Sequence, residues 1–299
     1  MYKLIMVPLD GSRVAEHALP VALSVARRAN CGIRLVHVVD ENIIRMADFA
    51  GVRGAPRATA EEYLENVVRR IAECSDVPVS TVIREGSVTD SLLAERLECG
   101  AELSVMTTHG TGGVSRAWLG SVTDFFVRHA IMPVLTVRPR DGDADLERDV
   151  DFRHIVIPLD GSPAAEQILD PAARFAATFG ARVTLLRVIA LSTVMAYRYA
   201  AYAMELNQTA FGRRRAEAQE YLETVARRFR EQGLEVTTAI GAHESPATGI
   251  LLHVAEVGAD GIAMSTRGRS GIRRAVLGSV TDKVIRAGDL PVLIYRARE

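Results

Sequence analysis

The chain has 299 residues, which is too long for one small core and predicts two domains of about 150 residues each. Hydrophobic residues make up 48% of the chain and charged residues 24%, as in ordinary globular proteins. The net charge of −1 provides no electrostatic basis for binding nucleic acid or an anionic membrane, and three widely spaced cysteines without a CxxC pair argue against a zinc or thioredoxin-like motif.

The first half of the chain alternates predicted strands and helices. Apolar runs predict strands at residues 4–9, 33–39, 79–85, 103–108 and 133–137. Helical periodicity predicts helices at residues 15–29, 60–74 and 88–100, followed by a short helix from Ser121. Strands that are apolar throughout and are separated by helices are typical of a parallel sheet covered on both faces. We therefore expect an α/β fold with a doubly wound, five-stranded parallel sheet.

The second half of the chain repeats the first. IMVPLDGS at residues 5–12 returns as IVIPLDGS at 155–162, and LGSVTD at 119–124 returns at 277–282. The chain is therefore a duplication of one unit, and each copy is expected to fold in the same way.

The offset between the two copies grows along the chain, so the second copy contains an insertion between Val188 and Glu220. Residues 194–206 of this insertion predict a helical extension with three tyrosines, which we expect to pack against the other repeat or a partner. The polar, acidic segment between the copies predicts a linker. The expected division is domain 1 at 1–140, the linker at 141–151 and domain 2 at 152–299.

A glycine-rich segment follows the fourth predicted strand of each copy. In copy one it reads THGTGGVSRAWLGSVTD, residues 108–124. Its glycines allow backbone N–H groups to approach a ligand, and Ser121 is a predicted N-cap of the next helix, whose N-terminus favours anions. The hydroxyl groups of Ser121 and Thr123 add donors, so the segment suits a di- or triphosphate. The alternative is that the segment is an ordinary helix cap. The recurrence of the segment in both copies favours the binding interpretation.

Asp10 and Asp160 end the first strand of their copies, within the repeated PLDGS. If strands one and four are neighbours where the strand order reverses, this segment and the glycine-rich segment meet in one crevice. A carboxylate there suits ribose hydroxyls or the base of a nucleotide, or it caps the following helix.

These segments resemble a tandem universal stress protein over both halves of the chain. The nucleotide-binding motif of that family is Gly, two residues, Gly, nine residues, Gly, then Ser or Thr. Copy one has Gly110, Gly120 and Ser121 at this spacing, and copy two has Gly268, Gly278 and Ser279. The first glycine is replaced in each copy, by Thr107 and by Ser265, where the side chain either crowds the nucleotide or donates to a phosphate.

The resemblance implies two Rossmann-like domains of the adenine nucleotide alpha hydrolase type, each with ATP in the crevice between strands one and four. It implies contacts at these positions of copy one: Pro8, Asp10, Val38, Thr107, Gly110, Gly120, Ser121, Val122 and Thr123. The corresponding positions of copy two are Pro158, Asp160, Val188, Ser265, Gly268, Gly278, Ser279, Val280 and Thr281. Val38 and Val188 would meet the adenine, although from the sequence alone each valine is also an ordinary core residue.

The expected function is that of an ATP-binding stress-response protein, a nucleotide-dependent regulator rather than a metabolic enzyme. The sequence has no P-loop, no GxSxG and no HExxH, and it indicates no catalytic residue and no metal site. The alternatives are a scaffold that binds no nucleotide and a slow ATP hydrolase assisted by Mg²⁺.

The expected partners are adenine nucleotide and the chain's own second repeat. The repeats would pair through their last strands, 133–137 and 291–295, with homodimers as a further form of assembly. No nucleic acid or membrane partner is expected. The N-terminus has no predicted signal peptide, and with the sparse cysteines this predicts a cytoplasmic protein.

Overall fold

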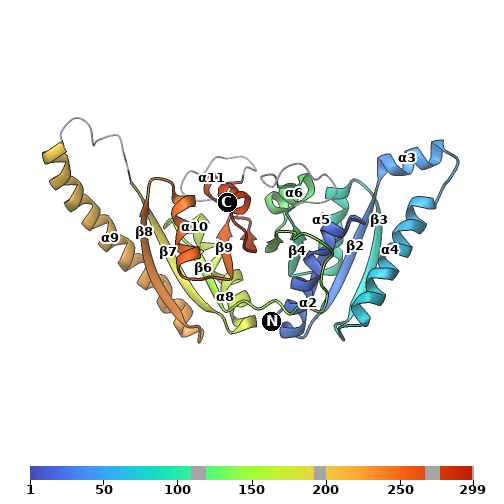
Figure 1. Cartoon of the computed structure of the whole chain (residues 1–299), viewed down its shortest axis with the longest axis horizontal. Helices are drawn as coiled ribbons and strands as arrows, with labels where there is room; N and C mark the ends of the chain where they lie inside the picture. The colour runs from blue at the N-terminus through green and yellow to red at the C-terminus, as the bar shows by residue number, and fades with distance from the viewer. Residues whose placement is uncertain (109–118, 192–199, 267–276, 298–299) are drawn as a thin grey trace. The chain divides into compact units, whose positions relative to one another are not determined.

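A computed structural model of the chain describes residues 1–108, 119–191, 200–266 and 277–297, with side chains described outside 200–210 (Figure 1). The contacts divide the chain into two compact units. Unit 1 contains Met1–Asp151 and Pro291–Arg296, and unit 2 contains Phe152–Leu290 and Ala297–Glu299. Within the described residues, no helix combines the length and the apolar character that crossing a membrane requires.

Unit 1 alternates strands with helices along most of its length. In chain order its elements are β1 (Leu4–Pro8), α1 (Arg13–Glu16), α2 (Ala18–Ala29), β2 (Gly32–Asp40), α3 (Glu41–Phe49), α4 (Ala55–Ala72), β3 (Val79–Gly86), α5 (Val88–Cys99), β4 (Leu103–Thr107), α6 (Ser121–His129), β5 (Val134–Val137) and β10 (Val292–Tyr295).

Unit 2 repeats the alternation of strands and helices, with α9, among the described residues, where unit 1 has α3 and α4. Its elements are β6 (His154–Pro158), α7 (Pro163–Glu166), α8 (Leu169–Phe179), β7 (Arg182–Ala190), α9 (Ala200–Glu231), β8 (Val236–His243), α10 (Pro246–Glu256), β9 (Gly261–Ser265) and α11 (Ser279–Ala287).

The sheet of each unit is doubly wound, as the sequence predicts. In unit 1 the strand order is β3-β2-β1-β4-β5-β10, and in unit 2 it is β9-β6-β7-β8. The consecutive strands of each repeat run parallel, with Ile5 opposite Leu103 in unit 1 and Ile155 opposite Gly261 in unit 2. The predicted adjacency of strands one and four is confirmed in both units. The strand order therefore reverses beside β1 and beside β6, which is the position where doubly wound folds bind ligands.

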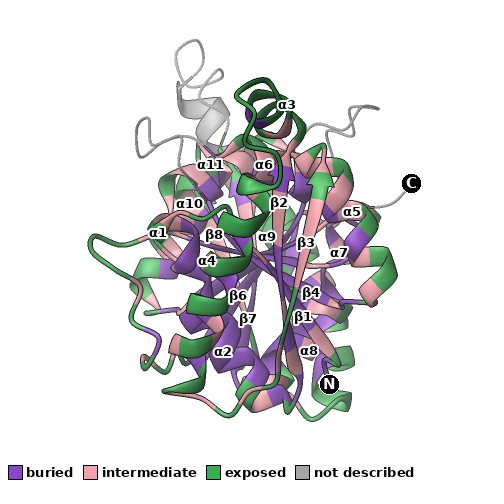
Figure 2. Cartoon of the chain, turned by 90° about the vertical axis from the view of Figure 1, so that its right-hand side faces the viewer, coloured by how far each residue is buried: buried purple, intermediate pink, exposed green. Residues whose placement is uncertain are grey.

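The sheet strands carry the core. All five residues of β4 and all five of β9 are buried, and Figure 2 shows the central strands in the buried class. Helix α2 covers β1, β2 and β4 and is itself buried along most of its length, because it is rich in alanine and valine. Right-handed crossovers place α4 on the face of α2, while α5 and α6 lie in contact on the other face.

Three helices differ from their predictions. The predicted helix 15–29 is split at His17, since Pro20 lacks the N–H that would bond back to the carbonyl of Glu16. The predicted helix 60–74 corresponds to α4, which begins earlier, at Ala55. Helix α3 has no predicted counterpart, and it begins where the Asp40 carboxylate accepts the N–H of Asn42 at 2.8 Å.

Strand β10 of the second repeat lies in unit 1. It pairs antiparallel with β5, with Leu293 opposite Leu135, and the hydroxyl of Thr136 donates to the Val292 carbonyl at 3.1 Å. The last strands of the two repeats therefore pair, as the sequence predicts, and β5 is not a free edge.

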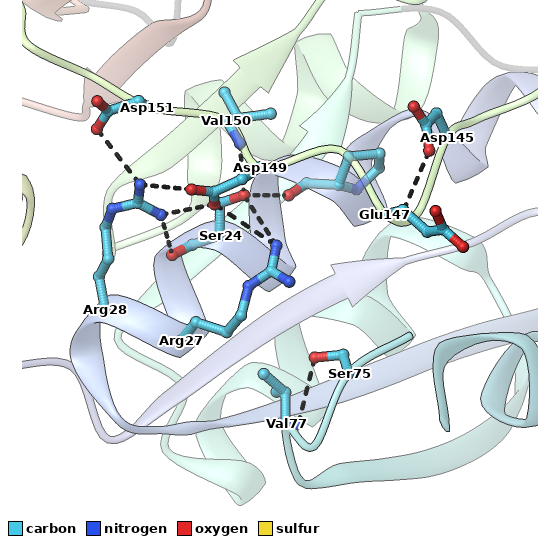
Figure 3. A network of polar contacts seen from close by, with 11 residues as sticks. Ser24, Arg27, Arg28, Ser75, Val77, Asp145, Glu147, Asp149, Val150 and Asp151 are labelled. Atoms are coloured by element: carbon cyan, nitrogen blue, oxygen red, sulfur yellow. Dashed lines mark hydrogen bonds and ion pairs between the residues drawn. The ribbon is translucent and has the colours of Figure 1, made fainter. Parts of the chain in front are cut away.

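The polar segment after β5 lies along helix α2 of unit 1 (Figure 3). Arg28 donates both terminal nitrogens to the Asp149 carboxylate, at 2.8 and 2.9 Å, and its guanidinium also lies 3.4 Å from Asp151. The N–H of Val150 donates to the buried Ser24 hydroxyl at 2.8 Å. The segment expected as a linker is therefore fixed to unit 1 by paired, charge-assisted hydrogen bonds.

We expect Arg28→Ala to lower the free energy of unfolding by about 0.5–1 kcal/mol at neutral pH, because the lost pair is partly exposed. The hydrogen bond from Arg28 lowers the pKa of Asp149 below its usual range. The stabilisation is therefore present above the unfolded carboxyl pKa and is lost as the pH falls through the lower folded value. Urea unfolding at several pH values should show the difference from wild type shrinking below about pH 4. Arg213→Ala, which breaks an exposed pair with Glu217, is the control and should show little change.

Candidate functional site

The turn after the first strand of each repeat has the same hydrogen-bonded form. The Asp160 carboxylate accepts the N–H of Ser162 at 2.9 Å and its hydroxyl at 2.5 Å, and Asp10 accepts those of Ser12 at 3.0 and 2.5 Å. Ser12 and Ser162, not the aspartates, are the N-caps of α1 and α7. Gly11 and Gly161 allow the turn because their φ angles are positive, at 85° and 76°. The N-cap alternative for Asp10 and Asp160 is therefore wrong, since the next serine fills that place.

The helix after the fourth strand begins without a side-chain cap. Gly120 and Gly278 are the N-cap residues of α6 and α11, and no described side chain caps them. Ser121 and Ser279 are the first helical residues, so the predicted N-cap role of Ser121 is wrong. The reason is that Gly120 and Gly278, with ψ of 145° and 142°, lie outside the helical region, so the serines that follow them are already within the helix. The first backbone N–H groups of these helices thus point out of the helix with no intrahelical acceptor.

A threonine in the first turn ties each helix to the preceding strand. Thr123 donates its hydroxyl to the Thr107 carbonyl, and Thr281 donates to the Ser265 carbonyl, both at 2.9 Å. A hydroxyl has one proton, so neither threonine donates to a phosphate in this geometry, contrary to the expectation for Thr123. The N–H groups of Gly120 and Gly278 are similarly used, by the carbonyls of Thr108 and Thr266 at 2.6 and 2.7 Å. In each unit the threonine and the glycine therefore position the N-terminus of the helix.

Unit 2 contains a cavity of about 880 Å³ at the carboxyl ends of its strands. This volume is within the range of small-molecule sites, about 300–1,000 Å³. The cavity brings together eight of the nine residues that the resemblance implies for copy two: Pro158, Asp160, Val188, Ser265, Gly278, Ser279, Val280 and Thr281. The ninth, Gly268, lies outside the described residues, as does Gly110 of copy one.

Ser265, which replaces the first motif glycine, has an unusual environment. Its side chain is buried and lines the cavity, and the described atoms around it offer its hydroxyl oxygen no hydrogen-bond partner. A buried hydroxyl without a partner costs free energy, so such a group is favoured where a ligand supplies the missing bond. Its counterpart Thr107 is also buried, at the end of β4.

The remaining residues expected in unit 1 take equivalent places. Pro8 ends β1 and Val38 lies in β2, half-buried like Val188 and not in the core. Ser121, Val122 and Thr123 form the first turn of α6. The two units thus share the turn, the threonine bond and the uncapped helix start.

Several cavity residues were not predicted from the sequence. Arg187 of β7 lines the cavity and donates to the Leu159 carbonyl at 3.3 Å. Helix α9 contributes Arg214, Glu217 and Tyr221. Burial, with the nearby Glu166 charge, raises the pKa of Tyr221, and its hydroxyl donates to Glu166 at 3.0 Å. The repeated EYLE segment, which places Tyr63 in copy one and Tyr221 in copy two, is the signal that could have identified this tyrosine.

The two repeats differ in charge beside this tyrosine. The position of Arg187 is His37 in copy one, and burial lowers the pKa of His37 below its usual value. Arg214 and Glu217 correspond to Pro56 and Thr59. The cavity of unit 2 therefore carries ionic groups that copy one lacks. Among the described residues, no cluster of three or more metal-ligating side chains is found.

Known proteins resemble the chain in sequence and in fold. The model of the universal stress protein family matches residues 1–138 and again 151–296. A Staphylococcus aureus protein named as a universal stress protein is 31% identical over 153 residues, which is 50% of this chain and 92% of that protein.

Two crystal structures match nearly the whole chain. A universal stress protein from Archaeoglobus fulgidus has a TM-score of 0.69 at 18% identity, covering 99% of this chain and 97% of its own. A Pseudomonas aeruginosa protein described as a universal stress protein has a TM-score of 0.65 at 17% identity, covering 99% and 94%. At such identities the likeness shows the fold.

We expect Thr281→Val to lower the free energy of unfolding by about 1 kcal/mol, because the isosteric change removes one buried hydrogen bond. Thr123→Val should have a similar effect through the equivalent bond in unit 1. Chemical denaturation of both variants checks this. Thr224→Val, whose hydroxyl bonds only within an exposed turn of α9, is the control. A loss no larger than that of the control would contradict a structural role for the two threonines.

Proposed function

This chain belongs to the universal stress protein family, and on that premise we propose that it is a regulator that binds ATP in the crevice of each repeat. The nucleotide would occupy the site beside β1 in unit 1 and the cavity beside β6 in unit 2. The proposal includes a role in the stress response of the cytoplasm. It treats the two domains, at 1–140 and 152–299, as two copies of one binding unit.

The observation that carries this proposal is the cavity of unit 2. It gathers the uncapped N-terminus of α11, the buried hydroxyl of Ser265 without a partner, and the Asp160 carboxylate. A polyphosphate supplies acceptors for the first two, and ribose hydroxyls supply donors for the third. The residues present therefore fit an adenine nucleotide.

Each group has a defined part in this proposal. The N–H groups of Ser279 and Val280, at the positive end of the helix dipole, would hold the phosphates. Thr281 would keep that helix start beside β9 through its bond to the Ser265 carbonyl. The apolar side chain of Val188 and the carboxylate of Asp160, both lining the cavity, would contact the nucleoside.

Mass spectrometry of ligand released from freshly purified protein, followed by titration with ATP with and without Mg²⁺, tests the proposal. We expect two nucleotides per chain. Gly120→Val and Gly278→Val should each abolish one site, because a valine side chain would be added at the uncapped helix start where we propose that the phosphates bind, and φ near −60° tolerates valine. Gly212→Val is the control, since Gly212 has open space around it on the exposed face of α9.

The outcome of the same titration separates the alternatives. Absence of bound nucleotide together with absence of ATP binding would contradict the proposal and favour a scaffold. ATP turnover that exceeds that of the Gly120→Val, Gly278→Val double variant would instead support slow hydrolysis.

Replacing Ser265 tests the part of the hydroxyl separately. We expect Ser265→Ala to raise the stability of the nucleotide-free protein slightly, because it removes a buried polar group without a partner. The same change should weaken ATP binding to unit 2 by about tenfold, the loss of one hydrogen bond. Thermal unfolding and calorimetry measure the two effects. Equal affinity for wild type and variant would show that the hydroxyl does not contact the ligand.

A further inference from the structure

One position of the second strand gives the two repeats different charges at the candidate site. Arg187 of β7 lines the cavity of unit 2, and its guanidinium donates to the Leu159 carbonyl at 3.3 Å. The equivalent residue of β2 in unit 1 is His37. An arginine keeps its charge at every ordinary pH, whereas a histidine changes its charge near neutrality. One copy therefore has a permanent cation where the other has a group that titrates.

His37 packs against the turn that follows β1. A Cβ placed on Gly11 of this turn would lie 3.8 Å from Cε1 of His37, and the ring hydrogen-bonds to the Leu9 carbonyl. That carbonyl is the equivalent of the Leu159 carbonyl in unit 2, so both side chains reach the same backbone group from the same strand position. The buried Nδ1 of the ring has no hydrogen-bond partner among the described atoms. The bond to Leu9 therefore uses Nε2, and the neutral ring carries its proton there.

The surroundings of His37 act on its charge in opposite directions. Burial lowers the pKa of the ring, while the bond to the Leu9 carbonyl and the charge of Asp10 partly oppose this effect. A second proton on the ring would have to sit on the buried Nδ1. At neutral pH the ring is therefore uncharged, and an anion brought close to it would favour the charged form.

The other ionisable groups around this ring come from α4, α1 and β3. The ring of Tyr63 on α4 lies 6.0 Å from that of the histidine, measured between centroids. Glu16 of α1 is paired with Arg70 at 2.7 Å, and Glu85 of β3 is paired with Arg57 at 3.1 Å. These two carboxylates are already balanced by arginines, so Asp10 and a bound ligand are the anions that act on the histidine.

A nucleoside polyphosphate brings several negative charges to this place. We infer that the residue at this position sets how each site responds to acid. Unit 1 binds its anionic nucleotide more tightly as His37 gains a proton, whereas unit 2, in which Arg187 is always charged, has no such gain. Both statements rest on the proposed binding of ATP.

The direction of the pKa shift gives the pH range of this effect. Without a ligand, burial places the pKa of His37 below the usual value of 6.5. A bound nucleotide raises it, because the negative charge favours the protonated ring. The affinity of unit 1 therefore rises as the pH falls through the interval between the two values, and it rises tenfold for each pKa unit that separates them.

Calorimetric titration with ATP from about pH 7.5 to about pH 5.5 tests the inference. The full chain with Gly278→Val reports unit 1, and the full chain with Gly120→Val reports unit 2. The terminal phosphate of ATP also gains a proton in this range, but both sites bind the same ligand, so the ratio of their affinities removes that effect. We expect the affinity of unit 1 relative to unit 2 to rise about three- to tenfold on acidification, within the range where circular dichroism shows wild-type helix content.

Exchanging the two residues between the repeats gives matched variants. His37→Arg should make the relative affinity independent of pH, and Arg187→His should give unit 2 the response that unit 1 has. His37→Gln, which keeps a donor for the Leu9 carbonyl, should hold unit 1 at its neutral-pH affinity. His253→Gln, on α10 and outside the cavity lining, is the control and should change nothing.

Nuclear magnetic resonance of the imidazole protons gives a direct measure of the same linkage. The His37 signal is the one lost in His37→Gln, and its pKa should rise when ATP saturates unit 1. A relative affinity that stays constant or falls in acid would overturn the inference while leaving ATP binding intact, and so would an unchanged acid response in His37→Gln. Absence of ATP binding at every pH would instead contradict the proposed function, and the inference with it.

Discussion

The parallel pairing of the first and fourth strands of each repeat is the constraint on which the site depends. Ile155 lies opposite Gly261, so the turn after β6 and the start of α11 emerge side by side. The first brings Asp160 and the second brings the uncapped helix N-terminus, although more than a hundred residues separate them in sequence. The hydroxyl of Thr281 then fixes the helix to the strand end at 2.9 Å. The cavity is therefore a product of strand order.

Duplication preserved this arrangement while the surroundings changed. The aspartate–serine turn, the threonine bond and the glycine N-cap recur with nearly the same distances in both units. A neighbouring position differs, since copy two has Arg187 where copy one has the half-buried His37, whose pKa is lowered by burial. The shared parts are those that we propose hold a phosphate-bearing ligand, and the differing parts lie around the tyrosine of α4 or α9. Two copies of one scaffold thus present two chemically distinct sites.

The strands and the location of the site could be predicted because they rest on local patterns. Apolar runs identified β1 and β4, and exact repetition identified Asp160 and Gly278. The roles of Ser121 and Thr123 could not be predicted, because a hydroxyl near a helix start caps it, bonds to a strand or faces a ligand according to tertiary position. Arg187 was missed for a related reason. It lies within β7, and the sequence pattern of a strand does not show that helix α9 lines a cavity beside it. Helix α3 was missed because no loop precedes it: Asp40 is both the last residue of β2 and the N-cap of α3.

The position of β10 in the sequence determines when β5 gains its partner during synthesis. Strand β5 of unit 1 has its partner β10 at residues 292–295, so that edge stays unpaired until these residues have left the ribosome. At about 5–20 residues per second, this interval lasts on the order of ten to thirty seconds. An apolar edge strand exposed for so long is a template for pairing with neighbouring nascent chains. That edge is therefore protected from such pairing only after the second repeat has been synthesised.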